Sequence, residues 1–326
     1  MMALPHPATD WCDMLDEVWQ CYRDLISHII DHETVLLIAP CKQMAEQAMQ
    51  GLLCPKLKII EADTNDTWTR DYGPITIVHD DGTPDLLDFR FNAWGMKFAA
   101  HLDNQVVPTL QAKGVFKAPL VNRQGFVLEG GSIESDGNGT IMTTTQCLLS
   151  RNRNDALSKD EIERTLKHDL GAEQVLWVNH GALDGDDTDA HIDTLARFAP
   201  GNTILFSGAL TATDAQSQSL LEMEAELRMA RNASGAPYRL LKLPIPDAML
   251  DDEGHRMPAT YANFLVTNHK VLVPTYGQPS NDRQALSVIA TAFTGRAVEG
   301  VDCRALIHQH GSLHCATMQI PKNTLS

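Results

Sequence analysis

The sequence predicts an α/β fold assembled from five repeated units around a shared centre. Short apolar runs typical of buried strands alternate with longer stretches that have helical spacing, which is the pattern of an α/β protein. Polar clusters recur where strands or hairpins begin: Asp71, Glu129, His191, Asn263 and Cys315 are separated by 58, 62, 72 and 52 residues. A repeat of this length can close into a ring whose loops point inward, so we expect these clusters to meet.

Apolar spacing and helix-stop signals place the predicted helices and strands. The first helix has apolar residues at three- and four-residue steps, with Asp10 as its cap, and Gly171 ends a later one. Helices are predicted at residues 10–30, 42–52, 155–170, 214–232 and 281–293. Continuous or alternating apolar runs bounded by turns predict strands at residues 35–39, 57–61, 75–78, 89–95, 140–145, 174–178, 203–206, 238–243, 260–266 and 271–274.

Length, charge and cysteine content limit the class of protein. The 326 residues, 43 % hydrophobic and 21 % charged, form one or two globular domains with a large core. A net charge of −16 argues against nucleic-acid or anionic-membrane partners and favours a small cationic ligand. Seven scattered cysteines, no secretory leader and no long apolar run predict a soluble cytoplasmic protein without a disulfide framework.

Two polar clusters precede strands in the first half of the chain. Residues 65–74 crowd Asp, Trp and Arg before a strand, which is typical of a binding loop, although a helix cap with a surface ion pair would look the same. Glu129 stands between an apolar run and Gly130-Gly131, as a buried carboxylate held by loop amides would. Neither a dinucleotide fingerprint nor a P-loop lysine is present there, which argues against nucleotide binding.

The acidic loop 184–193 ends in a histidine and an aspartate. On an extended segment His191 and Asp193 would share one face, as an acid–base group and a carboxylate aimed at the same ligand. A solvated loop is the simpler alternative. A calcium loop is excluded because positions six and twelve, counted from Asp184, are Asp189 and Leu195 instead of Gly and Glu. A zinc site is disfavoured because no second His or Cys stands at ligand spacing from His191.

Cys315 follows a glycine turn and precedes a short apolar run that ends at Pro321. This placement predicts a thiol presented at the mouth of a strand, where a thiolate can attack an electrophilic carbon. The competing interpretation is an inert core cysteine, because free cysteine is a small hydrophobic residue that is often buried. The polar clusters elsewhere in the chain favour the nucleophile.

Six motifs together resemble the agmatine deiminase family, the bacterial-type peptidylarginine deiminase group of the guanidino-group-modifying enzymes. They are DTWTRDYGP (66–74), FNAWG (91–95), LEGGS (128–132), CLLSRNRN (147–154), HID (191–193) and GSLHC (311–315). The resemblance covers residues 10–322. It implies a single domain over residues 1–326, folded as a five-bladed pseudo-symmetric α/β propeller of ββαβ repeats around a central active-site channel. It implies no metal and no organic cofactor.

The resemblance also assigns roles to the binding residues. Asp71 and Asp193, with Asp187 as a third carboxylate, would hold the planar guanidinium by paired N–H bonds. Trp68 would form a wall against the cationic substrate.

Three further residues would carry the chemistry by the same resemblance. Cys315 would attack the guanidinium carbon and form a covalent thiouronium intermediate. His191 would act first as acid and then as base, with Glu129 orienting it and Asp193 contributing to catalysis.

Departures from the family pattern leave open which residues bind the far end of the substrate. Met96-Lys97 follows the FNAWG motif where many relatives have a further glycine, and Asp189 and Ala190 replace Asn and Gly. Deimination of agmatine to N-carbamoylputrescine is the first hypothesis, and free or peptide-borne arginine is the alternative substrate. An inactive propeller that binds a cationic metabolite is the alternative from another class. Relatives also suggest a homodimer.

Overall fold

The computed structural model describes residues 1–209, 211 and 213–326. Its strands form five three-stranded sheets among the described residues, which confirms the α/β class and fits the five predicted repeats. The sheets are β1 (Met2–Ala3), β2 (Val35–Ala39), β3 (Leu57–Glu61); β4 (Ile75–Val78), β5 (Pro84–Arg90), β6 (Leu120–Val127); β7 (Ile133–Ser135), β8 (Thr140–Thr144), β9 (Gln174–Val178); β10 (Ala196–Ala199), β11 (Thr203–Ser207), β12 (Arg239–Leu243); and β13 (Leu265–Val266), β14 (Lys270–Thr275), β15 (Ala297–Asp302).

Four of these sheets have the expected ββαβ topology. Their first two strands pair antiparallel, and the third joins the middle strand in parallel after a helical connection. The sheet β1–β2–β3 differs, because β1 pairs in parallel with β2 in the register Met2↔Leu37. The middle strands β2, β8 and β11 are buried at every residue, which explains their continuous apolar or small-residue sequences.

Helices connect the strands of each sheet, and several have recognisable start and stop signals. They are α1 (Leu15–Ile30), α2 (Lys42–Ala48), α3 (Thr69–Tyr72), α4 (Ala93–Met96), α5 (Val106–Ala112), α6 (Thr145–Leu148), α7 (Arg151–Asn154), α8 (Lys159–Leu170), α9 (Ala215–Met229) and α10 (Pro279–Ala292). For example, Ser158 and Glu161 form a capping box at the start of α8, and Gly171 ends it at φ 68°. No described helix is long and apolar enough to cross a membrane.

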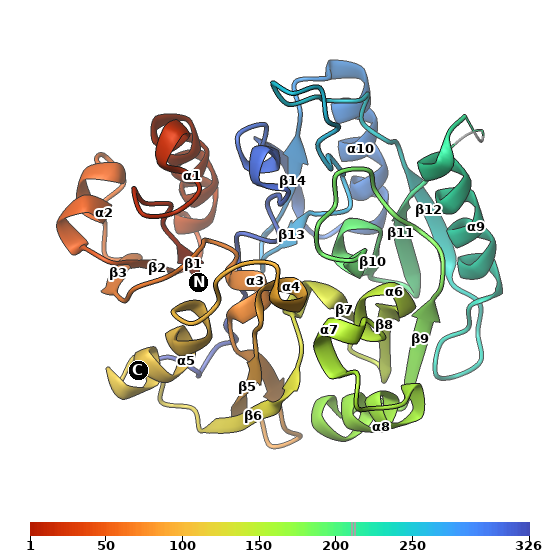
Figure 1. The fold of residues 1–326 in the computed structure, drawn as a ribbon, viewed down its shortest axis with the longest axis horizontal. Helices are drawn as coiled ribbons and strands as arrows, with labels where there is room; N and C mark the ends of the chain where they lie inside the picture. The colour runs from red at the N-terminus through yellow and green to blue at the C-terminus, as the bar shows by residue number, and fades with distance from the viewer. Residues whose placement is uncertain (210, 212) are drawn as a thin grey trace. The chain divides into compact units, whose positions relative to one another are not determined.

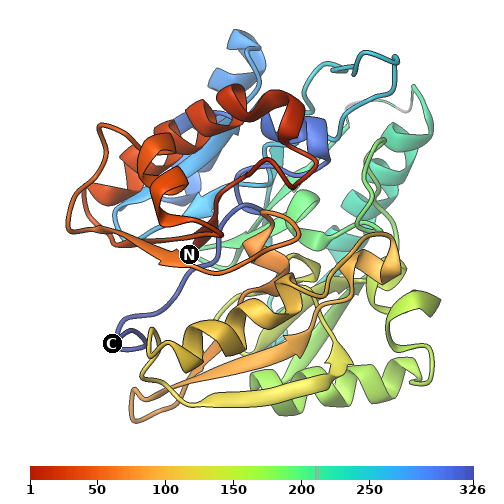
Figure 2. The same ribbon diagram turned by 60° about the vertical axis from the view of Figure 1, so that its left-hand side comes forward.

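The chain groups into two compact units. Unit 1 comprises Met1–Gly130 and the tail His314–Ser326, and unit 2 comprises Gly131–Leu313. In unit 1, α1 and α2 lie against the sheet β1–β2–β3 (Figures 1 and 2). In unit 2, α10 packs on β15 of its own sheet and on β12 of the preceding one. The expectation of a single domain stays a prediction.

The predicted elements were wrong in four places. Asp10 does not cap the first helix, because α1 begins at Leu15 after the 3-10 turn Cys12–Met14, and its N-cap residue is Met14. Residues 89–95 were expected to be the hairpin strand, but β5 starts at Pro84 and ends at Arg90, because a left-handed turn follows it. Residues 260–264 are not in a strand, and β13 has two residues only. No strand presents Cys315: β15 ends at Asp302, and residues 311–320 are turns and irregular chain.

Candidate active site

The short helix α3 in unit 1 carries Asp71. The Asp71 side chain is buried, and its Oδ2 accepts a hydrogen bond of 2.9 Å from the Trp94 indole Nε1. The backbone N–H of Asp71 bonds to the carbonyl of Trp68 at 3.0 Å. Both the backbone and the carboxylate are therefore held in place, as a residue that grips a planar cation requires.

A left-handed turn places Trp94 against Asp71. Four consecutive residues, Ala93 to Met96, have φ between 53° and 89°, a region that side chains with a Cβ seldom adopt. The Asn92 side chain caps the turn by accepting the Gly95 N–H at 3.0 Å. The Trp94 ring packs edge-on between Phe91 and Phe98, with centroids at 5.2 and 5.8 Å. This packing compensates for the backbone strain of the turn.

Met96→Gly is expected to raise the free energy of unfolding by roughly 0.5–1 kcal/mol, because glycine adopts positive φ without steric cost. Met96 has φ 66° and a side chain that is 69 % exposed, so the substitution removes little packing. The matched control is Met229→Gly, an equally exposed methionine in helix α9, which should lower stability by up to about 1 kcal/mol. Urea unfolding measures the change in the free energy of unfolding for both variants. Equal losses of stability in the two would contradict backbone strain at Met96.

The Cys315 segment lies directly on α3. The Arg70 N–H donates to the Cys315 carbonyl at 3.1 Å, and the Thr69 hydroxyl donates to the Ala316 carbonyl at 3.2 Å. The Cys315 side chain is 6 % exposed. These bonds attach the candidate nucleophile to the helix that also carries Asp71.

Glu129 reaches the same helix through the glycine that follows it. A Cβ on Gly130 would lie 2.2 Å from the Arg70 carbonyl oxygen, so only glycine fits this close approach. The Glu129 side chain is fully buried. Three of the five sequence clusters, those of Asp71, Glu129 and Cys315, therefore meet at α3 within unit 1.

The loop before α3 is fixed by a reciprocal pair of side chains. Asp103 Oδ1 accepts the N–H groups of Asn65 and Asp66 at 2.7 and 3.2 Å, and Asn65 Oδ1 accepts the Leu102 N–H at 2.7 Å. Further along this loop, Trp68 is buried and packs on Trp11 with ring centroids 5.8 Å apart. These hydrogen bonds and this ring packing hold the loop in place. From the sequence alone, a helix cap with a surface ion pair was an equally good interpretation.

Asp103→Asn is expected to stabilise the protein relative to wild type as the pH rises from 5 to 9. Burial raises the pKa of Asp103 to about 8, and its Oδ2 has no hydrogen-bond partner among the described residues. The carboxyl is therefore neutral in the folded state but ionised in the unfolded state above about pH 4. Its stabilising contribution is complete below that pH and is lost as the pH approaches 8. Asparagine keeps the accepting oxygen and never ionises.

Melting temperatures at pH 5, 7 and 9 measure this effect. The exposed Asp81 is the control, because hydrogen bonds from Thr83 lower its pKa and it is ionised in both states throughout this range. Asp81→Asn should therefore give a constant offset. The same constant offset for Asp103→Asn would show that Asp103 is already charged in the native protein.

Unit 2 holds two more of the residues that the sequence predicts for a site. His191 and Asp193 are both fully buried, which agrees with an inward position and excludes the solvated-loop alternative for these two residues. The argument from an extended segment was wrong, because His191 precedes a 3-10 turn, Ile192–Thr194. The Asn263 side-chain amide donates to the Asp193 carbonyl at 3.5 Å, so two further clusters meet within this unit. Asp187 is half-buried.

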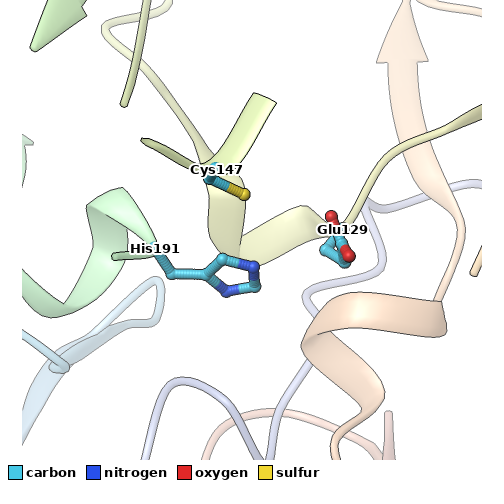
Figure 3. Close-up of side chains that lie close together, drawn as sticks. All are labelled: Glu129, Cys147 and His191. Carbon is cyan, nitrogen blue, oxygen red and sulfur yellow. The ribbon is translucent and has the colours of Figure 1, made fainter. Parts of the chain in front are cut away.

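Cys147 lies beside His191 within unit 2. Its sulfur and an imidazole nitrogen are within 4.8 Å of each other, and both side chains are fully buried (Figure 3). Figure 3 also draws Glu129, the last side chain of unit 1 before Gly130. The sequence argument against a zinc site considered only ligand spacing along the chain, and Cys147 lies 44 residues from His191. The absence of a metal stays a prediction.

Sequence reasoning missed the contacts of three residues. Trp94 and Cys147 stand inside motifs that were singled out, but their partners Asp71 and His191 lie 23 and 44 residues away in sequence. No feature of the sequence indicated the role of Asp103, because a single aspartate in a polar stretch looks like any solvent-exposed residue. By contrast, none of Asp71, Glu129, His191, Asp193 and Cys315 faces bulk solvent.

Comparison with known proteins gives consistent matches over nearly the whole chain. A family model described as Porphyromonas-type peptidyl-arginine deiminase matches residues 1–321. A protein from Porphyromonas gingivalis, provisionally named an arginine deiminase, is 47 % identical, with a TM-score of 0.94 and coverage of 100 % of this chain and 96 % of that one. A C. jejuni agmatine deiminase with a cysteine-to-serine substitution and substrate bound is 39 % identical, with a TM-score of 0.88, covering 97 % and 91 %. The agmatine deiminase of Stutzerimonas stutzeri is 31 % identical over 98 % of this chain and 92 % of its own.

Proposed function

Since the chain belongs to the Porphyromonas-type peptidyl-arginine deiminase family, we propose that it hydrolyses the guanidinium group of agmatine to N-carbamoylputrescine and ammonia. One observation carries the proposal. Cys315 and Glu129 are attached to the helix that bears the buried Asp71, so a thiol and two carboxylates belong to one rigid part of unit 1. A soft nucleophile with buried acids suits an electrophilic carbon in a cation.

Substrate binding depends on carboxylates that accept N–H bonds in the plane of the guanidinium. Asp71 and Asp193 take this role, with Asp187 as a third acid and Trp68 as an aromatic wall for the cation. The bond from Trp94 directs one oxygen of Asp71 and leaves the carboxylate in a fixed orientation. Holding the cation flat exposes its central carbon to attack from above the plane.

The reaction then proceeds in two halves. The Cys315 thiolate adds to the carbon, and His191 protonates the departing nitrogen, so that ammonia leaves and an S-alkylthiouronium remains on the enzyme. Water gives a proton to His191 and attacks the thiouronium, and collapse releases the thiol and the ureido product. Glu129 orients His191, and Asp193 stabilises the cationic intermediate. No cofactor enters this scheme, so chelators should leave turnover unchanged.

Agmatine is favoured over arginine by two observations. The C. jejuni and S. stutzeri relatives are named agmatine deiminases, and a chain with net charge −16 attracts the dication agmatine more strongly than arginine, whose net charge is about +1. Arginine is retained as the second candidate because the relative with 47 % identity is provisionally named an arginine deiminase.

Colorimetric ureido detection with agmatine, free arginine and a blocked arginine peptide tests the proposal. The expected result is turnover of agmatine with a kcat/KM at least about tenfold above either arginine compound, a difference of about 1.4 kcal/mol in transition-state binding. Asp193→Asn should lose both substrate affinity and kcat, because it removes a charged acceptor. If an arginine compound were preferred, it would take the place of agmatine as the proposed substrate. If no guanidino compound were turned over, the proposed activity would be rejected.

We also infer a cytoplasmic enzyme that binds neither nucleic acid nor membrane. The net charge of −16 and the scattered spacing of the seven cysteines support this proposal. A homodimer is expected from the family, and sedimentation of the purified protein measures it.

A further inference from the structure

We propose that Arg153 is a positioning residue for His191, which it holds through Thr188 and Asp189. The inference rests on the proposed acid–base role of His191. It concerns residues of unit 2 alone, and Arg153 stands on the short helix α7, six residues after Cys147.

The Arg153 guanidinium bridges the backbone and a side chain of the loop before His191. Its side chain is completely buried, with one terminal nitrogen 2.5 Å from Asp189 Oδ2 and the other donating to the Thr188 carbonyl at 2.9 Å. Asp189 itself is 27 % exposed. A planar, permanently charged fork can satisfy two acceptors at a fixed separation, which a single ammonium cannot do in the same way.

A chain of hydrogen bonds leads from this bridge to the His191 backbone. Thr188 Oγ1 accepts the His191 N–H at 3.2 Å and donates to Asp186 Oδ1 at 2.5 Å. Asp186 Oδ2 accepts the Ala190 N–H at 2.7 Å. Thr188 is therefore the shared residue, since its carbonyl is fixed by Arg153 and its hydroxyl fixes His191.

The loop conformation needs such support. Asp189 and Ala190 have φ of 65° and 63°, the left-handed region that residues with a Cβ avoid. The Thr144 hydroxyl holds the far side by donating to the Ala190 carbonyl at 2.8 Å. Thr144, Cys147 and Arg153 thus contact the His191 segment from one stretch of ten residues. That stretch therefore holds the backbone of the His191 segment in place within unit 2.

Misplacing an acid–base group affects the chemical step more than binding. Proton transfer requires the imidazole within hydrogen-bond reach of the leaving nitrogen, whereas substrate affinity comes mainly from the carboxylates. Loosening the loop should therefore lower kcat and leave KM nearly unchanged. A role limited to overall stability would alter neither parameter in the folded variant.

The test uses Arg153→Met, Arg153→Lys, Asp189→Ala and the double variant Arg153→Met/Asp189→Ala in the full chain. We expect Arg153→Met to lower kcat by roughly 30-fold, below the ~10²-fold that a shift of ~1 Å can cost, with KM within about twofold. Arg153→Lys should restore part of the rate because one of the two bonds can form. The double variant should be no slower than Arg153→Met, because the two residues act through each other.

The control is Lys270→Met, which removes a mostly buried cation that pairs with Glu299 across β14 and β15. It should leave kcat and KM unchanged at a temperature where it is folded. The proposal would be overturned if folded Arg153→Met had wild-type kcat. It would also be overturned if the whole loss in kcat/KM came from a higher KM. If Arg153→Met does not fold, Arg153→Lys and Asp189→Ala decide the question, and wild-type kcat in both rejects the proposal.

A spectroscopic measurement separates this inference from the proposed activity. In protein labelled with ¹⁵N-histidine, the His191 ring signals are assigned by their loss in His191→Gln. They should shift or broaden in Arg153→Met and remain at wild-type positions in Lys270→Met. If the wild type turns over no guanidino compound, the proposed function fails, but these signals still test whether Arg153 holds His191. Unchanged signals reject the positioning role whatever the activity.

Discussion

Cys315→Ala is expected to lower kcat for ureido formation by about five orders of magnitude or more, because no other group in the scheme can form the thiouronium. Loss of the nucleophile in a covalent hydrolase costs about 10⁶ in kcat. The Cys315 carbonyl, which binds the Arg70 N–H, remains in the alanine variant, so its backbone should keep its place on α3. Guanidinium binding should persist, and isothermal titration with agmatine should detect it.

The melting temperature of Cys315→Ala distinguishes a nucleophilic Cys315 from a core cysteine. Removal of one buried sulfur should lower the melting temperature by no more than about 4 °C, roughly 1 kcal/mol for a large domain. Cys21→Ala is the matched control, since Cys21 is also 6 % exposed and lies on α1 in the same unit. It should lose similar stability and keep full turnover. Turnover that survives Cys315→Ala, or a fall in melting temperature above about 10 °C, would revive the core interpretation.

His191→Ala should lower kcat by about 10³-fold, with a KM for agmatine within a few-fold of wild type. The loss is within the range for a positioned acid–base group, and it affects both ammonia release and attack by water. Because His191 is fully buried, alanine leaves a cavity and some stability is lost as well. Steady-state kinetics at several pH values, well below the melting temperature, measure the effect on turnover.

A buried histidine elsewhere provides the comparison. His6→Ala removes an imidazole that is 6 % exposed in unit 1 and bonds to Thr64 at 3.3 Å. It should lose stability without loss of kcat. If His191→Ala retained more than about a tenth of wild-type kcat, proton transfer would have to be assigned to another group. Mass spectrometry of quenched reactions also shows whether the covalent intermediate accumulates in this variant.

The fold could be predicted where local sequence determines local structure. The middle strands β2 and β11 have continuous apolar sequences because both faces of each strand are covered, and this pattern survives any detail of packing. The C-terminal stop at Gly171 likewise acts within a few residues of the helix that it ends. The repeat spacing also predicted the five units, which appear as five three-stranded sheets among the described residues.

Local reasoning failed where backbone groups bond to distant segments. A strand was expected near Cys315, but the Cys315 carbonyl bonds to Arg70 on α3 instead of to a neighbouring strand. An extended segment was expected at His191, but the side chains of Asp186 and Thr188 bond to the backbone and bend it. Such contacts depend on residues that the tertiary fold brings together, and no periodicity in the sequence encodes them.

Unit 1 is formed by two separate segments of the chain, Met1–Gly130 and His314–Ser326, and this affects when the enzyme can become active during synthesis. Asp71 and Glu129 are translated early, whereas the thiol that docks on their helix is translated only after residues 131–313. In the proposed scheme, a ribosome-bound chain that has not reached the tail has the acidic groups but lacks the Cys315 thiol, so it should be inactive. Because the returning tail must also close a long chain loop, its docking should be among the last events of folding.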